Sequence, residues 1–319
     1  MIKQVVVATS GKVVGGPAIP IEVLTSNQAA GLPIEAKPMR VVAVTQADIA
    51  AGRKVVGGRP IPVVMGVAGV DDVDGPIIPV WVVSGNLVDP TEVYTNKILA
   101  TGPIAYWTMG EPSGATALDA TGNSRTGAYS SVTLGQPGIG DGKTCPSFDG
   151  TASLNNIYTA SLAAAFNGAE GSVMIWGKVS DSAVWTDGQT RRLIYLAADT
   201  NNRVSLVKPA ANNEVDYLYA AGGVNKAAGI TSFSPTGFFN ALLTWSKVAD
   251  QVKFYVNGAQ VGATGTGLGT FAGSLASGTT LIGSIATSPS NLWKGFLAHA
   301  AIWTRPLTGA EAASCASIS

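Results

Sequence analysis

The chain has 319 residues, and its 20 basic side chains balance its 20 acidic ones, so the formal net charge is zero. Only 13% of the residues are charged, which leaves no basic surface for nucleic acid or anionic membranes, and we expect neither partner. Two cysteines and one histidine are too few for a zinc site or a Ser-His-Asp triad. An enzyme built on this chain would therefore have to use carboxylates.

Apolar residues make up 46% of the chain, but they occur in short runs broken by Gly, Pro or Ser. None of these runs approaches the ~18 residues of a membrane-spanning helix, so we expect no membrane insertion. Residues 1–7 contain an apolar stretch of only three residues, and no cleavage-like site follows it. This start differs from a signal peptide and predicts a protein made in a cytosol.

The first 96 residues differ from the rest in composition. They hold 21 valines and 9 of the 17 prolines, but only Trp81 and Tyr94 of the 23 aromatic residues. So few aromatic side chains would leave a thin core. We therefore interpret residues 1–96 as an extended, β-rich arm ordered by a partner or by its own oligomer, and residues 97–319 as a separate domain. A small independent β-domain and a disordered segment are the alternatives for the arm.

The arm repeats a strand–turn–strand motif. VVVAT and KVVGGPAIPI at residues 5–21 return as VVAVT and KVVGGRPIPV at 41–63, and a shortened copy, GPIIPVWVV, stands at 75–83. A short helical turn is expected at 46–51. Proline has no amide hydrogen to donate, so these strands suit a sheet edge or a surface on which the arm docks. The predicted docking residues are Ile19, Pro20, Ile61, Pro62, Ile78, Pro79 and Trp81.

From Gly102 onward, apolar segments recur at the spacing of an all-β sandwich. The predicted strands are 104–109, 172–179, 191–197, 204–208, 215–220, 240–247, 251–256, 279–285 and 295–303. Turn pairs such as Asn257-Gly258 separate them. Thr308 and Glu311 have the spacing of a capping box and predict one short helix near the end.

Several segments also carry a family likeness, in a fixed order along the chain. They are IAYWTMGE at 104–111, DATGN at 119–123, SFDG at 147–150, SVMIW at 172–176, FYVNG at 254–258, IG at 282–283, WKGF at 293–296 and AIWTRPLTGAE at 301–311. Together they resemble laminin-G-like, concanavalin A-like jelly-roll domains over about residues 103–314. The resemblance implies a two-sheet antiparallel sandwich, in a family of glycan binders, adhesion modules and structural spacers. Where members often carry an acidic residue, this chain has Leu297-Ala298-His299, which argues against an inherited calcium site.

Aromatic and arginine side chains gather on or beside the strands in the middle of this domain. Such side chains suit stacking on a sugar or anchoring of a protein partner, and core packing is the alternative. Tyr217 and Tyr219 alternate on one strand and would share a face. The candidate ligand face comprises Trp185, Arg191, Arg192, Tyr195, Tyr217 and Tyr219.

The acidic residues predict no catalytic site. The glutamates of the domain form no paired motif of a glycosidase strand, so we expect a protein that is not an enzyme. The aspartates in Gly-rich loops are interpreted as turn residues, with Ca²⁺ binding as the alternative, and no other metal or cofactor is expected. The glutamates are Glu111, Glu170, Glu214 and Glu311, and the aspartates are Asp71, Asp72, Asp74, Asp119, Asp141 and Asp149.

Three further residues could carry chemistry. His299 lies in an alanine-rich strand and is predicted to be structural. Cys145 and Cys315 bracket the domain, and the sequence leaves open whether they form a disulfide or remain free thiols.

These features predict a non-enzymatic bacteriophage virion structural protein that decorates the capsid as a cement or head-fibre protein. The arm would dock on the major capsid protein or another virion protein, and the sandwich would project outward and bind a host surface glycan. We expect a homo-oligomer, such as a trimer, in a virion assembled in the host cytoplasm. A tail-associated receptor-binding protein is the first alternative, and a cell-surface adhesion or glycan-processing protein is the second.

Overall fold

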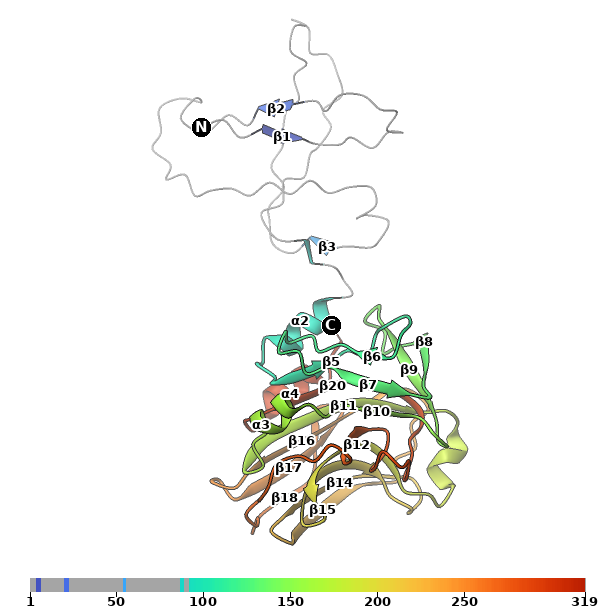
Figure 1. Cartoon of the computed structure of the whole chain (residues 1–319), viewed down its shortest axis with the longest axis vertical. Coiled ribbons are helices and arrows are strands. Elements are labelled where there is room, and N and C mark those ends of the chain that lie inside the picture. The colour runs from blue at the N-terminus through green and yellow to red at the C-terminus, as the bar shows by residue number, and fades with distance from the viewer. Residues whose placement is uncertain (1–3, 7–19, 23–53, 56–86, 89–91, 319) are drawn as a thin grey trace, which may run out of the picture. The chain divides into compact units, whose positions relative to one another are not determined.

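The structure is a computed structural model that describes residues 4–6, 20–22, 54–55, 87–88 and 92–318. The chain divides into two units, Met1–Glu92 and Val93–Ser319. In the first unit, β1 (Gln4–Val6) pairs with β2 (Pro20–Glu22), and β3 (Lys54–Val55) pairs with β4 (Leu87–Val88) (Figure 1). Apart from Pro20, the predicted docking residues lie outside the described residues, as do the helical turn at 46–51 and the aspartates at 71–74.

The second unit is a sandwich of two antiparallel sheets, as predicted (Figure 1). Sheet I has the order β15-β14-β13-β12-β19-β10-β7-β6. Its strands are β6 (Thr116–Ala117), β7 (Gly127–Ser130), β10 (Leu154–Asn156), β12 (Arg191–Asp199), β13 (Asn202–Lys208), β14 (Glu214–Ala221), β15 (Val224–Thr231) and β19 (Thr280–Ile282).

Sheet II has the order β18-β17-β16-β11-β20-β9-β8, and β5 pairs with β20 beside it. Its strands are β5 (Ala105–Trp107), β8 (Thr133–Pro137), β9 (Thr144–Asp149), β11 (Glu170–Val179), β16 (Phe239–Ser246), β17 (Gln251–Val256), β18 (Ala259–Gly265) and β20 (Lys294–Trp303). The helical segments are α2 (Val93–Leu99), α3 (Ala160–Ala165), η2 (Ser182–Thr186) and α4 (Gly309–Cys315). All nine predicted strands are present, and the expected domain boundary after residue 96 falls inside α2.

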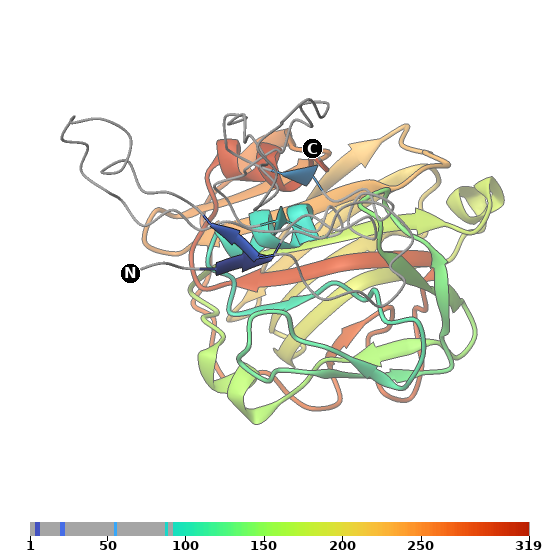
Figure 2. The ribbon, with the colours of Figure 1, turned by 90° about the horizontal axis from the view of Figure 1, so that it is seen from above.

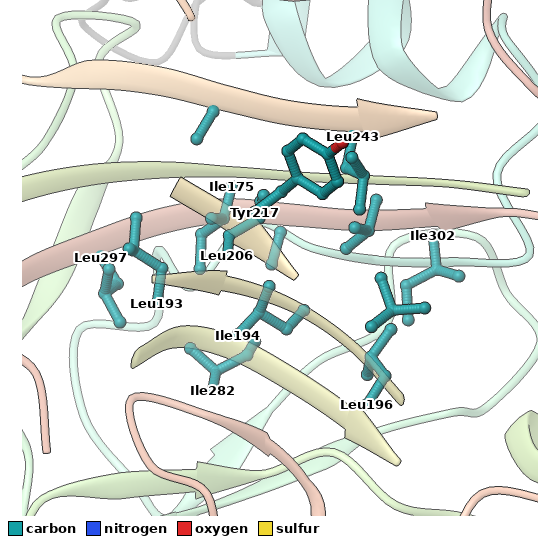
Figure 3. Packing of buried hydrophobic residues seen from close by; sticks show 14 of the residues in the cluster. Ile175, Leu193, Ile194, Leu196, Leu206, Tyr217, Leu243, Ile282, Leu297 and Ile302 are labelled. Carbon is teal, nitrogen blue, oxygen red and sulfur yellow. The ribbon is translucent and has the colours of Figure 1, made fainter. Parts of the chain in front are cut away.

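The main core lies between the two sheets, where alternate residues of each strand point inward. Figure 3 shows Leu193, Ile194 and Leu196 of sheet I in this core, together with Leu297 and Ile302 of sheet II. All five are fully buried. Burial of each such side chain contributes about 1.5–3 kcal/mol, so this layer fixes which face of every strand is hidden.

A second core covers the outer face of sheet II. Tyr94 and Ile98 of α2 and Cys315 of α4 pack with Met174 and Trp176 of β11. The two helices lie on the same side of the sandwich (Figure 2). The Tyr94 hydroxyl donates to the carbonyl oxygen of Cys315 at 2.6 Å and accepts from Trp176 Nε1 at 2.7 Å. Helices α2 and α4, which stand at the two ends of the second unit, therefore cover the outer face of sheet II.

Two local signals behave as the sequence predicts. Thr308 caps α4 and forms a capping box with Glu311. Asn257 and Gly258 both have positive φ, +49° and +80°, which a two-residue hairpin turn of the primed type requires between β17 and β18. Across the described residues, the longest helices have seven residues, and none could cross a membrane.

Candidate functional site

The structure corrects three of the predicted ligand-face residues. Trp185, Tyr217 and Tyr219 all belong to the core between the sheets. Trp185 Nε1 donates to the carbonyl oxygen of Pro235, and the Tyr219 hydroxyl donates to that of Gly168. Tyr217 and Tyr219 do share a face of β14, but that face points inward. Alternation along a strand identifies residues that share a face, but it does not say which face meets solvent.

Arg191 has a structural role. Its guanidinium lies 2.6 Å from Asp187 Oδ2, and Nη1 donates to the carbonyl oxygen of Leu292. The buried Lys208 ammonium lies 3.1 Å from the other oxygen of Asp187. Partial burial raises the pKa of Asp187, but donors from Gln189, Arg191 and Lys208 outweigh it and leave that pKa below its ordinary value. These contacts hold the η2 loop and engage all three guanidinium nitrogens of Arg191.

Tyr195, one of the predicted ligand-face residues, lies on the outer face of sheet I. Its neighbours in the chain, Ile194 and Leu196, point into the core. Arg192 lies on the same outer face, with its guanidinium carbon 5.7 Å from the centre of the Tyr195 ring. Arg192 Nη1 donates to Ser205 Oγ at 3.0 Å on the adjacent strand. Of the predicted ligand face, Arg192 and Tyr195 therefore lie side by side on this outer face.

The guanidinium of Arg192 is only partly satisfied. Its Nε is buried and has no hydrogen-bond partner among the described residues. Burial lowers the pKa of Arg192, the nearby Tyr195 raises it, and the positive charge of Arg203 lowers it further. Arginine nevertheless keeps its charge in proteins. A charged guanidinium group with one unpaired N–H donor thus lies beside the Tyr195 ring.

An acidic pair lies two strands away on the same face. Glu214 and Asp216 are two residues apart on β14, so both point outward. In the register, Val207 of β13 stands between Arg192 and Asp216. Burial raises the pKa of Asp216 to about 7, and the charge of Glu214 and a hydrogen bond from its carboxyl group add to the rise.

Asp216 packs against a glycine of the edge strand. A Cβ added at Gly229 would lie 1.6 Å from Asp216 Oδ1, so only a glycine leaves room for this carboxyl group. Asp216 Oδ1 is buried and accepts no hydrogen bond from the described residues. The spacing of Glu214 and Asp216 along one strand could have indicated this pair from the sequence, which instead predicted no paired carboxyl motif.

The outer face of sheet I carries groups that can bind a ligand. Glycosidases place two carboxyl groups roughly 5–5.5 Å or 6.5–9.5 Å apart, on either side of the scissile bond. Glu214 and Asp216 instead stand side by side on one face of a single strand, close enough for the charge of Glu214 to raise the pKa of Asp216. The face can instead offer a ring for stacking, guanidinium donors and carboxylate acceptors.

The aspartates proposed as alternative calcium ligands close loops. Asp119 accepts from the backbone of Tyr106, Thr121 and Arg125. Asp149 accepts from residues 151–153, and these donors hold its pKa below the ordinary value against the effect of burial. Among the described residues, no three His, Cys, Asp or Glu side chains gather as a metal site would require.

Asp141 and His299 form a separate buried cluster. His299 Nε2 lies 3.0 Å from Asp141 Oδ2, and both side chains are 1% exposed. His299 Nδ1 shares a 2.6 Å hydrogen bond with the Tyr106 hydroxyl, and the Tyr94 ring packs edge-on against the imidazole. The cluster lies beneath α2 in the second core, which agrees with the structural role predicted for His299.

Cys145 and Cys315 are free thiols in the same core. Burial raises the pKa of Cys145 to about 12 and that of Cys315 to about 11, so both are protonated at neutral pH. Neither is therefore a ready nucleophile.

One family model matches the chain, that of the Concanavalin A-like lectin/glucanases superfamily, over residues 149–313, a little more than half of the sequence. No curated protein matches. Among solved structures, domain 4 of an extracellular arabinanase from Geobacillus stearothermophilus, in complex with arabinotriose, has a TM-score of 0.49 at 17% identity. The match covers 67% of this chain and 98% of that domain.

Two other solved structures are similar over comparable lengths. The receptor binding domain of botulinum neurotoxin mosaic serotype C/D gives a TM-score of 0.51 at 12% identity and covers 67% of this chain. Trypanosoma rangeli sialidase in complex with sialic acid gives 0.51 at 13% identity and covers 68%. The matches span 50% of the neurotoxin domain and 33% of the sialidase. At these identities the likeness concerns the fold.

Proposed function

The chain belongs to the Concanavalin A-like lectin/glucanases superfamily, and from this premise we propose that its sandwich binds a glycan without cleaving it. The supporting observation is the contrast between the two outer faces. Helices α2 and α4 cover that of sheet II, whereas sheet I presents Arg192, Tyr195 and the Glu214–Asp216 pair, all partly exposed. A ring for stacking with hydrogen-bonding groups on both sides is what a sugar requires.

Binding to a glycan array tests the proposal. We expect the full chain to bind a subset of glycans and Tyr195→Ala to lose that binding. The matched control is Phe238→Ala, which removes a partly buried ring that packs on the second core. Binding that survives Tyr195→Ala and disappears with Phe238→Ala would place the ligand elsewhere.

A sugar-release assay on the bound polysaccharides tests the second half of the proposal. We expect no release above that of the Glu214→Gln/Asp216→Asn double variant. Release that depends on these two carboxyl groups would instead favour the glycan-processing alternative.

The proposed setting is a bacteriophage virion in which residues 1–96 attach to the capsid and the sandwich is displayed as decoration. Its support is the threefold strand–turn–strand repeat of the arm, which suits main-chain pairing with a partner's sheet edge. A homo-oligomer on such a lattice would multiply weak sugar contacts. The tail-associated receptor-binding protein is the competing setting.

Immunogold electron microscopy with antibodies against residues 97–319 separates these settings. Uniform label on virion heads supports decoration, and label at the tail tip supports receptor binding. A preparation in which particles carry no label contradicts both.

A further inference from the structure

We propose that the outer face of sheet I selects a sugar that carries a carboxylate, which Arg192 and Arg203 hold beside the Tyr195 ring. The inference rests on the proposed glycan binding and adds the chemical class of the ligand. Uronic acids and sialic acids share this chemistry.

The first argument is uncompensated positive charge. Arg191 and Lys208 both lie within 3.1 Å of Asp187, and Arg305 lies 2.5 Å from Glu311. Within residues 92–318, by contrast, neither Arg192 nor Arg203 forms a salt bridge with a carboxylate, although the charge of Arg203 helps to lower the pKa of the more distant Asp199. Two like charges on one face repel each other, and a bound anion would relieve that repulsion.

The second argument is the placement of the two arginines. In the β12–β13 register, Tyr195 faces Ser205, to which Arg192 is hydrogen-bonded, and Arg203 lies two residues from Ser205 on the same face. Two residues along a strand span about 7 Å. The two arginines therefore occupy positions on either side of the Tyr195–Ser205 pair, close enough for the charge of Arg203 to lower the pKa of Arg192.

The third argument is the free donor of Arg192. Its Nη1 is used by Ser205, whereas its Nε is buried without a hydrogen-bond partner. Because Nε is covered, a carboxylate reaches it only when the guanidinium group turns toward the ligand; it would then accept two parallel N–H bonds, one of them from Nε. Such a bond would satisfy a donor that otherwise costs folding free energy.

The rest of the face argues for a sugar acid rather than a polyanion. The Tyr195 ring offers a surface for the C–H face of a pyranose. Glu214 and Asp216 lie two strand spacings from β12, about 10 Å, and can accept hydrogen bonds from hydroxyl groups. They would repel a polymer with an anion on every unit, so the face suits one carboxylate among neutral hydroxyls.

The experiment compares matched ligands on the full chain by calorimetry or array titration. The pairs are glucuronate with glucose, galacturonate with galactose, and sialyllactose with lactose, and the methyl esters of the acids keep the shape without the charge. We expect at least one acid to bind at least about 10-fold more tightly than its neutral counterpart and its ester. The pair that shows this preference distinguishes uronic from sialic acids.

Variants test the assigned residues. We expect Arg192→Gln and Arg203→Gln each to weaken acid binding about 10-fold, and the control Lys294→Gln, which removes an exposed positive charge from sheet II, to leave it unchanged. If Arg192→Gln lowers the unfolding midpoint, acid binding by Arg203→Gln, a change at a partly exposed residue, decides the result. Equal binding of acids and neutral sugars, or acid binding that both variants retain, overturns this inference alone. Failure to bind any glycan overturns the proposed function with it.

Discussion

The buried contact between Asp141 and His299 makes a quantitative prediction. Burial raises the pKa of Asp141, but contacts with His299 and the amide of Lys143 outweigh it, so that the pKa lies below its ordinary value of 3.8. In His299→Asn the imidazole is gone, and burial acts against only two backbone hydrogen bonds, those of Lys143 and of Asp141 itself. The φ of His299 is +48°, a conformation that asparagine tolerates well, so the backbone can stay in place.

The part of the cost that falls on the charge of Asp141 has an upper bound, and the lost bond to the Tyr106 hydroxyl adds to it. The carboxyl group of Asp141 can escape a buried, unpaired charge by taking up a proton. At pH 7 this costs about 1.4 kcal/mol for each pH unit above 3.8, about 4 kcal/mol in all. Removing one partner of a buried pair commonly costs about 3–5 kcal/mol, which agrees with this bound. We therefore expect His299→Asn to lose about 3–4 kcal/mol at pH 7, or roughly 6–16 °C in Tm.

The sign of the pH dependence follows from the same carboxyl group. In the wild type the pKa of Asp141 is lowered, so its contribution is present above pH 3.8 and is lost as the pH falls below it. In His299→Asn the pKa is raised, so the variant loses stability as the pH rises from about 4 to 7. The difference between wild type and variant should therefore shrink toward low pH.

Urea unfolding of the full chain at pH 4.5 and pH 7, followed by tryptophan fluorescence, measures this difference. The control is Lys294→Gln, which breaks the exposed pair with Asp181, 3.7 Å apart, and should cost under about 1 kcal/mol at either pH. A loss in His299→Asn that is independent of pH, or no greater than that of the control, would refute the reasoning.

Three further predictions concern single contacts, each read from the unfolding midpoint. Tyr94→Phe should cost about 1–3 kcal/mol because it leaves Trp176 Nε1 and the carbonyl oxygen of Cys315 unpaired; an unchanged midpoint would show that water replaces the hydroxyl. Asp216→Asn should stabilise the chain by about 1 kcal/mol at pH 8 and by little at pH 4, because a raised pKa means that only the ionised carboxylate destabilises the fold. The gain is small because the side chain is partly exposed to solvent. Equal gains at both pH values would contradict this. Gly229→Ala should cost about 1–3 kcal/mol because its Cβ meets Asp216 Oδ1 and, at 2.3 Å, the carbonyl oxygen of Val215; a neutral effect would mean that the carboxyl group and the β14 backbone both move aside freely.

The sequence predicted the sandwich because its strands carry strong local signals. The alternating segment at 251–256 and the Asn257-Gly258 turn depend only on neighbouring residues, and so does the capping box of Thr308 and Glu311. Strands β15 and β18 were missed because their exposed, small residues carry no apolar alternation. Helix α2 was missed because its stability comes from Tyr94 and Ile98 packing on distant strands.

The candidate site was harder to predict, because each of its features depends on pairing between strands. Tyr195 and Tyr217 look alike in sequence, yet one lies on the outer face and the other in the core. The irregular register between Arg192 and Ile194 on β12 sets Arg192 and Tyr195 on one face although they are three residues apart. No periodic pattern in a single strand reveals that shift.

The two sheets differ in which outer face remains available to a ligand. The helices at the two ends of the second unit explain this difference. Sheet II needs a cover because Met174, Trp176 and Leu242 point outward and are apolar. α2 and α4 supply that cover from opposite ends of the second unit, so ligand binding there would require removing packed helices. The outward residues of sheet I include Arg192, Arg203, Glu214 and Asp216, whose charges need water or a polar ligand. A sugar satisfies this need, since it brings its own hydroxyls to a face that an apolar cover would leave with unpaired charges.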